Sequence, residues 1–195
     1  MYSISNMKPI RCYIFDLDGT LVHNEHANTE AYKAAFAALG LTITTEEYGT
    51  YFGLGVADML AAHTKKLGIA NTPELLKKLK ETKAKEYAKR MHLIEKNNTT
   101  VGLLRSLAPH YHTALATTAR EVNARAVLDA FDLTEYFNFM VFGEDVKKTK
   151  PDPECHHIIA KHFNVEPSEC IIFEDSNSGL RAAEAFGAHI CKIVK

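Results

Sequence analysis

Acidic side chains stand directly after an apolar, strand-like run near the start of this chain. In Tyr13–Val22, the apolar positions lead into Asp16 and Asp18, and Gly19 follows. Burying an isolated carboxylate costs several kcal/mol, so an acidic pair at the end of a core strand needs a compensating partner, most simply a divalent cation. The pattern therefore predicts a metal-dependent site with a carboxylate nucleophile.

A second cluster follows the apolar run 113–116, where Thr117 and Thr118 precede a helical pattern. A hydroxyl group and the following backbone N–H can hold a phosphate oxygen at a helix N-terminus. The alternative is that Thr117 or Thr118 only caps the helix. Taken alone, this cluster favours the alternative.

A third cluster is the lysine-rich segment 147–153, which contains Lys147, Lys148 and Lys150 ahead of two prolines. Most lysines at such a helix start are solvated charges. Two aspartates, a phosphate and one divalent metal would nevertheless leave excess negative charge, which a compact ammonium group can neutralise. One lysine of this segment is therefore a candidate for the site.

A fourth cluster places Glu174 and Asp175 directly after the apolar run 170–173. The alternative function is a helix N-cap, which Asp175 or Asn177 could supply without a metal. Each cluster has such an alternative when it is considered alone. Four clusters that all follow strand-like runs, in this order, make independent coincidence improbable.

The elements that position these clusters follow from hydrophobic periodicity. After Asn97, strand-like runs alternate with helical patterns, which predicts an α/β fold with a doubly wound parallel sheet. Residues 45–96 show helical patterns and no strand pattern. The expected strands span 11–15, 113–116, 139–142, 170–173 and 189–193, and the expected helices span 28–39, 56–67, 73–91, 101–107, 121–131, 153–163 and 179–186, with a further capped start at 44–47.

On these residues the chain resembles the haloacid dehalogenase (HAD) superfamily of phosphohydrolases, over about residues 10–194. The family's first motif is Asp-x-Asp-x-Thr at the end of the first strand, and Asp16 to Thr20 match it. The resemblance selects Thr117 as the hydroxyl of the second motif and Lys150, which precedes a proline, as the lysine of the third. The segment from Glu174 to Gly179 is similar to the fourth motif.

The resemblance implies a phosphatase with a Rossmann-like core that works through an aspartyl-phosphate. Asp16 would attack phosphorus, and Asp18 would protonate the leaving oxygen and then deprotonate the hydrolytic water. Thr117 and Lys150 would neutralise the phosphoryl oxygens.

The implied cofactor is Mg²⁺. Its oxygen ligands would be Asp16, the main-chain carbonyl of Asp18, and Asp175, with water and the substrate phosphate completing an octahedron. Glu174 would act through a water molecule or from behind the ligands.

The helical region is expected to be a lid. We predict a catalytic core of residues 1–24 and 97–195 and a helical cap of residues 25–96, since insertions at the carboxyl ends of strands can cover a ligand. The alternative is a helical decoration that only adds stability. Substrate contacts are expected from Thr118 in the core and from Gly53, Leu54 and Val56 in the cap, whereas Phe52 is assigned to the cap's own core.

Substrate and reaction are constrained by two further features. The loop 51–58 contains no Arg or Lys, which favours small neutral leaving groups such as sugars or polyols, with phosphoglycolate as a further substrate implied by the resemblance. β-Phosphoglucomutase shares the four motifs but has a histidine ten residues after the second motif aspartate, where this chain has Asn28. We therefore favour a phosphatase over the alternatives, a sugar-phosphate mutase and a non-catalytic phosphometabolite sensor.

Composition bounds the remaining properties. Lys plus Arg (23) nearly equals Asp plus Glu (24) among 195 residues, so a nucleic-acid partner is not expected. The four cysteines form no CxxC pair, which indicates a reducing cytoplasm, and no apolar run suggests a membrane span or a secretory signal. Residues 1–8 are predicted to be a loose leader, with Met7 as an alternative start. A final strand edge blunted by Lys192 and Lys195 fits a monomer or a weak dimer.

Overall fold

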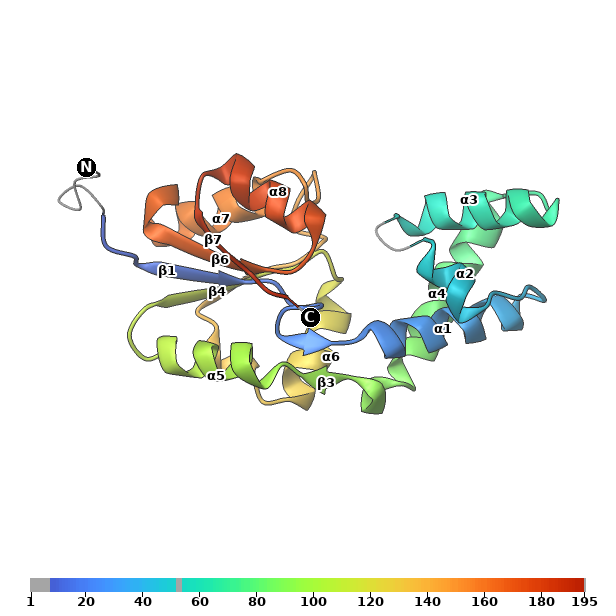
Figure 1. Ribbon diagram of the computed structural model, residues 1–195, viewed down its shortest axis with the longest axis horizontal. Helices are drawn as coiled ribbons and strands as arrows, with labels where there is room; N and C mark the ends of the chain where they lie inside the picture. The colour runs from blue at the N-terminus through green and yellow to red at the C-terminus, as the bar shows by residue number, and fades with distance from the viewer. Residues whose placement is uncertain (1–7, 52–53, 195) are drawn as a thin grey trace. The chain divides into compact units, whose positions relative to one another are not determined.

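The computed structural model describes residues 8–51 and 54–194 of the chain (Figure 1). The chain divides into two compact units, a helical unit of residues 24–95 and a core unit formed by the rest. The expected leader lies almost wholly outside the described residues, as do Phe52 and Gly53.

The core unit is built on a parallel sheet with the strand order β5-β4-β1-β6-β7. Its strands are β1 (Cys12–Phe15), β4 (His112–Ala116), β5 (Phe139–Val141), β6 (Cys170–Glu174) and β7 (His189–Lys192). Phe15 is in register with Leu115 on one side and Phe173 on the other, so the three central strands end at the same level. The chain therefore leaves three neighbouring strands at one edge, where ligands bind in open α/β sheets.

Helices cover both faces of this sheet. Figure 1 shows α7 (Glu154–Phe163) and α8 (Asn177–Phe186) on one side and α5 (Asn98–Leu107) and α6 (Glu121–Ala130) on the other. The first pair buries Ile159 and Phe186 against Ile14 and Ile172, in a cluster with the three buried cysteines Cys12, Cys155 and Cys170. All four cysteines of the chain are free. The predicted α/β fold class is confirmed.

Two short strands were missed. β2 (Val22–His23) and β3 (Glu95–Lys96) pair with each other where the chain leaves and re-enters the core unit, so the expectation of no strand in 45–96 is wrong at its end. Two residues are too few to show a period of two, which explains the error. The described residues also include short 3₁₀ turns at Met91–Leu93, Thr134–Tyr136 and Pro167–Glu169.

The helical unit contains α1 (Glu25–Ala38), α2 (Thr45–Gly49), α3 (Val56–Leu67) and α4 (Pro73–Ala88). Its core gathers Phe36, Met59, Leu60 and Leu79. The predicted capped start of α2 is confirmed, because the Thr44 hydroxyl accepts from the Glu47 N–H while the Glu47 carboxylate accepts from the Thr44 N–H. Gly68, at a φ of 67°, ends α3 where the sequence predicts.

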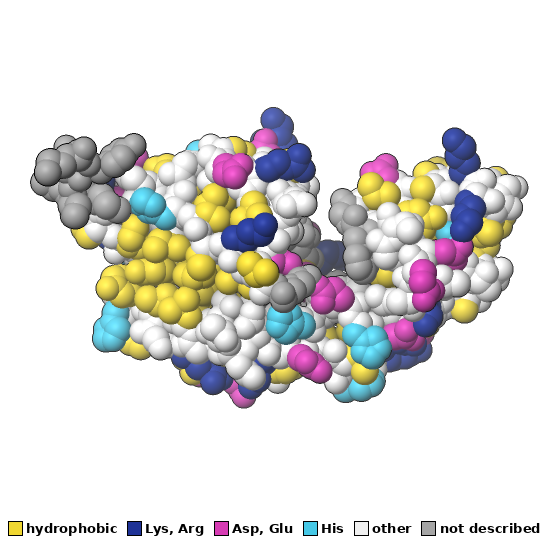
Figure 2. Space-filling model, viewed as in Figure 1, with side chains coloured by type: hydrophobic (Ala, Val, Ile, Leu, Met, Phe, Trp, Pro, Cys, Tyr) yellow, Lys and Arg dark blue, Asp and Glu magenta, His cyan; other side chains and the backbone are white. Residues whose placement is uncertain are grey.

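The edge strand β7 is exposed at all four residues, as expected. Figure 2 shows hydrophobic side chains gathered over the strands on one face of the core unit. Among the described residues, none of the helices combines the length and the apolar character needed to cross a bilayer.

A buried histidine in α7 couples the stability of the core unit to pH. His156 has no exposed surface, and neither ring nitrogen has a hydrogen-bond partner among the described residues. Burial, reinforced by the charge of Lys150, lowers the pKa of His156 to about 3. The unfolded chain, in which a histidine has a pKa of about 6.5, therefore binds a proton that the folded protein does not, and stability is lost as the pH falls below that value.

We expect the free energy of unfolding of the wild type to fall by about 2 kcal/mol more than that of His156→Leu between pH 7 and pH 5. Urea unfolding at the two pH values measures the difference. His26→Leu, which removes an exposed histidine of α1, is the control and should follow the wild type. Equal losses in the wild type and His156→Leu would contradict the prediction.

Candidate active site

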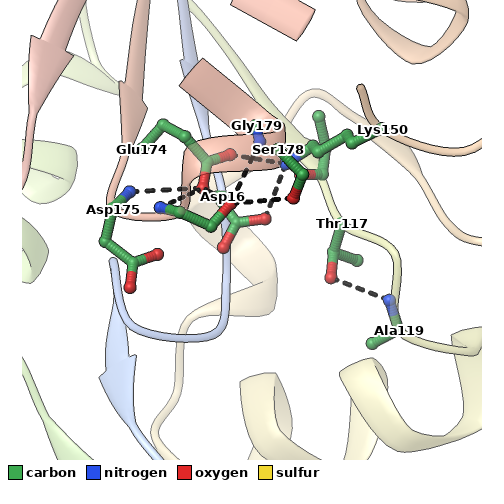
Figure 3. A network of polar contacts seen from close by, with 10 residues as sticks. Asp16, Thr117, Ala119, Lys150, Glu174, Asp175, Ser178 and Gly179 are labelled. Carbon is green, nitrogen blue, oxygen red and sulfur yellow. Dashed lines mark hydrogen bonds and ion pairs between the residues drawn. The ribbon is translucent and has the colours of Figure 1, made fainter. Parts of the chain in front are cut away.

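The three central strands deliver three polar side chains to one edge of the sheet. Asp16 follows β1, Thr117 follows β4 and Asp175 follows β6 (Figure 3). Backbone hydrogen bonds fix their starting points, since the Asp16 N–H donates to the Phe173 carbonyl and the Thr117 N–H donates to the Val141 carbonyl, each at 3.0 Å. Asp16 and Thr117 are 101 positions apart in the sequence. They lie at neighbouring strand ends because the strands are parallel and in register.

Lys150 is the centre of the site. Its Nζ donates to Asp16 Oδ1 at 2.7 Å, to Glu174 Oε2 at 2.7 Å and to the Ala116 carbonyl at 2.9 Å. Its side chain is only 4% exposed. Burial alone would lower the pKa of Lys150, but the carboxylates of Asp16 and Glu174 outweigh burial and raise it, so the side chain stays cationic.

The other two lysines of this segment are exposed, as expected. Their backbone N–H groups are nevertheless fixed, because Glu154 accepts from Lys147 N at 3.1 Å and from Lys148 N at 2.9 Å. The first turn of α7 therefore holds the loop that carries Lys150.

Glu174 fixes the backbone that follows it and is also a partner of Lys150. Its Oε1 accepts from Asp175 N, Ser176 N and Ser176 Oγ at 2.8–3.2 Å. Gly179 packs so tightly on this carboxylate that a methyl group there would collide with it. The glycine of the fourth motif is thus required by the close approach of α8 to Glu174.

The carboxylates form a group suited to a cation. Oxygens of Asp16, Glu174 and Asp175 all lie within 4.8 Å of one another. Burial raises the pKa of Asp16, as do the charges of Glu174 and Asp18, with Lys150 opposing them, and burial followed by the charge of Glu174 raises the pKa of Asp175 to about 6. One ammonium group does not balance these carboxylates, and hard oxygen ligands are those that Mg²⁺ prefers, so the residues present fit that ion.

Asp18 lies two residues beyond Asp16 in a tight loop closed by Gly19 N donating to the Val22 carbonyl at 2.7 Å. Gly19 has a φ of 86°, and a methyl group there would collide with the Asp175 carboxylate. The Asp18 side chain is half-buried and close enough to influence the pKa of Asp16 and of Asp175. The loop therefore brings both aspartates of the first motif to the acidic group.

The helix-cap alternatives are wrong for both loops. Thr117 Oγ1 accepts from Ala119 N at 3.0 Å, while α6 begins later, with Arg120 as its N-cap, and Thr118 is exposed. Ser176, rather than Asp175 or Asn177, caps α8 by accepting from Gly179 N at 3.0 Å. The side chains of Thr117 and Asp175 therefore do not cap a helix.

The predicted substrate contacts of the helical unit lie at the start of α3. Leu54 is 50% exposed, whereas Val56 packs against the core of the helical unit, and Gly53 lies outside the described residues. Asn28, on α1, accepts from Lys83 Nζ on α4 at 2.8 Å. Lys83 also lies over the ring of Tyr87, 4.2 Å from its centroid, a cation–π contact that the sequence did not signal.

Comparison with known proteins identifies the family. The family model for haloacid dehalogenase-like hydrolases matches residues 13–193, and the chain belongs to this family. The predicted resemblance is confirmed.

Several relatives are informative. The chain is 32% identical over 176 residues to a phosphorylated carbohydrates phosphatase of Thermotoga maritima, covering 89% of this chain and 80% of that protein. It is 26% identical to a fructose-1-phosphate phosphatase of Escherichia coli, covering 89% and 91%. The crystal structures of CbbY from Rhodobacter sphaeroides, with phosphate and with xylulose-1,5-bisphosphate, are 26% identical with a TM-score of 0.81, covering 93% of this chain and 84% of theirs.

Removal of the Lys150 ammonium group would leave buried carboxylates uncompensated. We expect Lys150→Met to lower the free energy of unfolding by about 3 kcal/mol at pH 8 in EDTA, because breaking a buried pair strands a buried charge. The loss should be smaller at pH 5, since the raised pKa of Asp16 lets that group take up a proton. Urea unfolding measures both values. Lys148→Met, at a side chain that is 76% exposed, is the matched control, and an equal loss there would refute the prediction.

Proposed function

We propose that this protein is a Mg²⁺-dependent phosphomonoester hydrolase that acts on a small phosphorylated metabolite, namely a sugar phosphate, a polyol phosphate or phosphoglycolate. One observation carries the proposal: the buried Lys150 holds Asp16 beside a carboxylate group suited to a cation. The names of the Thermotoga maritima and Escherichia coli relatives support the substrate class.

The chemistry assigns one task to each side chain. Asp16 attacks phosphorus, which breaks the bond to the leaving alcohol and forms an aspartyl-phosphate, and water then hydrolyses this intermediate to release phosphate. Asp18 gives a proton to the leaving oxygen and later takes one from the attacking water. Lys150 and the Thr117 hydroxyl stabilise the charge on the phosphoryl oxygens.

Asp16, Asp175 and the Asp18 carbonyl would hold Mg²⁺, with Glu174 bound through water or standing behind these ligands. When bound, that ion supplies positive charge for the phosphate. Glu174 already accepts four hydrogen bonds, from Asp175, Ser176 and Lys150, so its part is to support Asp175 and Lys150 more than to bind the ion directly.

The helical unit is proposed to be the lid that selects the substrate. Its exposed Leu54 and the neighbouring Gly53 and Val56 are the proposed contacts, together with Thr118 of the core unit. Asn28 favours hydrolysis over the mutase alternative, because its amide, bonded to Lys83, cannot exchange protons with a sugar hydroxyl as a histidine can.

Mg²⁺ binding should compete with protons at the acidic group. We expect the affinity for Mg²⁺ to rise between pH 5 and pH 7, because the pKa of Asp175 is raised to about 6 and the ion binds the ionised form. Asp175→Asn should weaken binding by about tenfold or more at pH 7. Calorimetric titration with MgCl₂ measures both effects. Asp132→Asn, at an exposed residue with a φ of 55° that asparagine also tolerates, is the control, and the same affinity in all three proteins would refute the site.

The function itself is tested by phosphate release from sugar, polyol and glycolate monophosphates, with Mg²⁺ and with EDTA. We expect release with Mg²⁺ only, and we expect Asp16→Asn to lower turnover by about a thousandfold or more, because the nucleophile is lost. Asp16→Asn hydrolysing at the wild-type rate would contradict the proposal. Phosphate binding without any turnover in the wild type would indicate the sensor instead, and conversion of one sugar phosphate into another would indicate the mutase.

A further inference from the structure

The loop after β5 is hydrogen-bonded to the segment that carries Thr117. The turn of residues 142–145, which we name the β5 turn, makes four contacts with the segment 117–121 within the core unit. The β5 turn is itself closed by the Asp145 carboxylate, which accepts from Phe142 N at 2.8 Å, and by Asp145 N, which donates to the Phe142 carbonyl at 3.1 Å. A loop that is fixed in this way can position its neighbour.

Two of the four contacts come from Gly143. Its N–H donates to the Ala119 carbonyl at 2.9 Å, and the backbones approach so closely that a Cβ atom on Gly143 would lie 2.5 Å from the Thr118 carbonyl oxygen. Any other side chain at position 143 would therefore push the two loops apart.

The other two contacts come from Glu144. Its Oε2 accepts from Glu121 N at 2.9 Å and its Oε1 accepts from Arg120 Nε at 3.2 Å. Glu121 is the first residue of α6, and the N-cap residue, Arg120, makes no side-chain capping bond. Glu144 thus supplies from another loop the carboxylate cap that α6 lacks, and the hydrogen bond from Glu121 N is the main reason that the pKa of Glu144 is lowered.

We propose that Glu144 is a positioning residue for phosphate binding: it fixes the 117–121 segment and thereby the Thr117 hydroxyl. This rests on the proposed function, in which Thr117 contacts the phosphoryl oxygens. Thr117 Oγ1 accepts from Ala119 N, and the Ala119 carbonyl accepts from Gly143 N. The contacts of the β5 turn therefore reach the Thr117 hydroxyl through one further hydrogen bond.

The charge of Glu144 alone predicts the opposite change in phosphate affinity, so the two explanations can be distinguished. Glu144 carries negative charge near a phosphate site, so its removal should tighten anion binding if charge alone mattered. Removal should weaken binding if the carboxylate positions the loop. Glu144→Gln separates the two, because the amide keeps an acceptor for Glu121 N and loses the charge.

The test compares Glu144→Ala and Glu144→Gln with the matched control Glu121→Ala. The control removes the carboxylate of Glu121, which is 51% exposed, against 47% for Glu144, and which pairs with Arg125. We expect Glu144→Ala to raise both KM and the inhibition constant of inorganic phosphate by about tenfold, as expected for a lost charge-assisted hydrogen bond. Glu144→Gln and Glu121→Ala should stay within about threefold of the wild type. A merely structural loss would lower the apparent kcat through a smaller folded fraction and leave KM unchanged.

Hydrogen exchange at the Ala119 and Glu121 amides provides a readout that does not need turnover. Exchange of both should be faster in Glu144→Ala than in the wild type and unchanged in Glu121→Ala. Unchanged or lower KM and phosphate constants in Glu144→Ala would overturn the proposal, and so would unchanged exchange. A wild type that releases no phosphate would defeat the proposed function alone, because the exchange measurement would still decide whether Glu144 fixes this loop.

Discussion

The site depends on one buried ammonium group. Lys150 bonds to Asp16 after β1, to Glu174 at the end of β6 and to the Ala116 carbonyl at the end of β4, so a single side chain ties together the three central strand ends. The same contacts balance part of the negative charge that the site concentrates. A sheet edge that gathers several carboxylates in a poorly solvated place is unstable without such a counter-charge, and the charge that remains uncompensated is what makes the edge suited to a cation.

The loops that form the candidate site are irregular, yet their backbone groups are fixed by carboxylates. Glu174 accepts from the N–H groups of Asp175 and Ser176, Glu154 accepts from those of Lys147 and Lys148, and Glu144 accepts from that of Glu121. Charge-assisted hydrogen bonds of this kind satisfy backbone donors that no strand or helix would satisfy. The result is three loops with defined positions around Lys150, which is what stabilising a transition state requires.

Much of this was predictable from sequence, and the failures have physical reasons. The sheet strands and the helices were predicted because their apolar residues repeat with clear periods. Asp16 and Asp175 were proposed because each follows a strand-like run, whereas the resemblance to the family's motifs selected Thr117 and Lys150. The pair β2 and β3 was missed because two residues carry no period. The cap alternatives at α6 and α8 named the wrong residues because several neighbouring polar side chains could accept from the first N–H groups of each helix. Glu144 gave no signal at all, since its partner is the N–H of Glu121, 23 positions earlier at the start of α6, and only the sheet brings the two together.

We propose that Asp16, held by Lys150, becomes covalently phosphorylated during turnover. The most direct measurement is mass spectrometry of the protein quenched in acid while it hydrolyses its best substrate with Mg²⁺. We expect one phosphoryl group on the peptide that contains Asp16, and none on that peptide when substrate is omitted. Steady turnover with no phosphorylated peptide, or with the phosphoryl group on another residue, would contradict it.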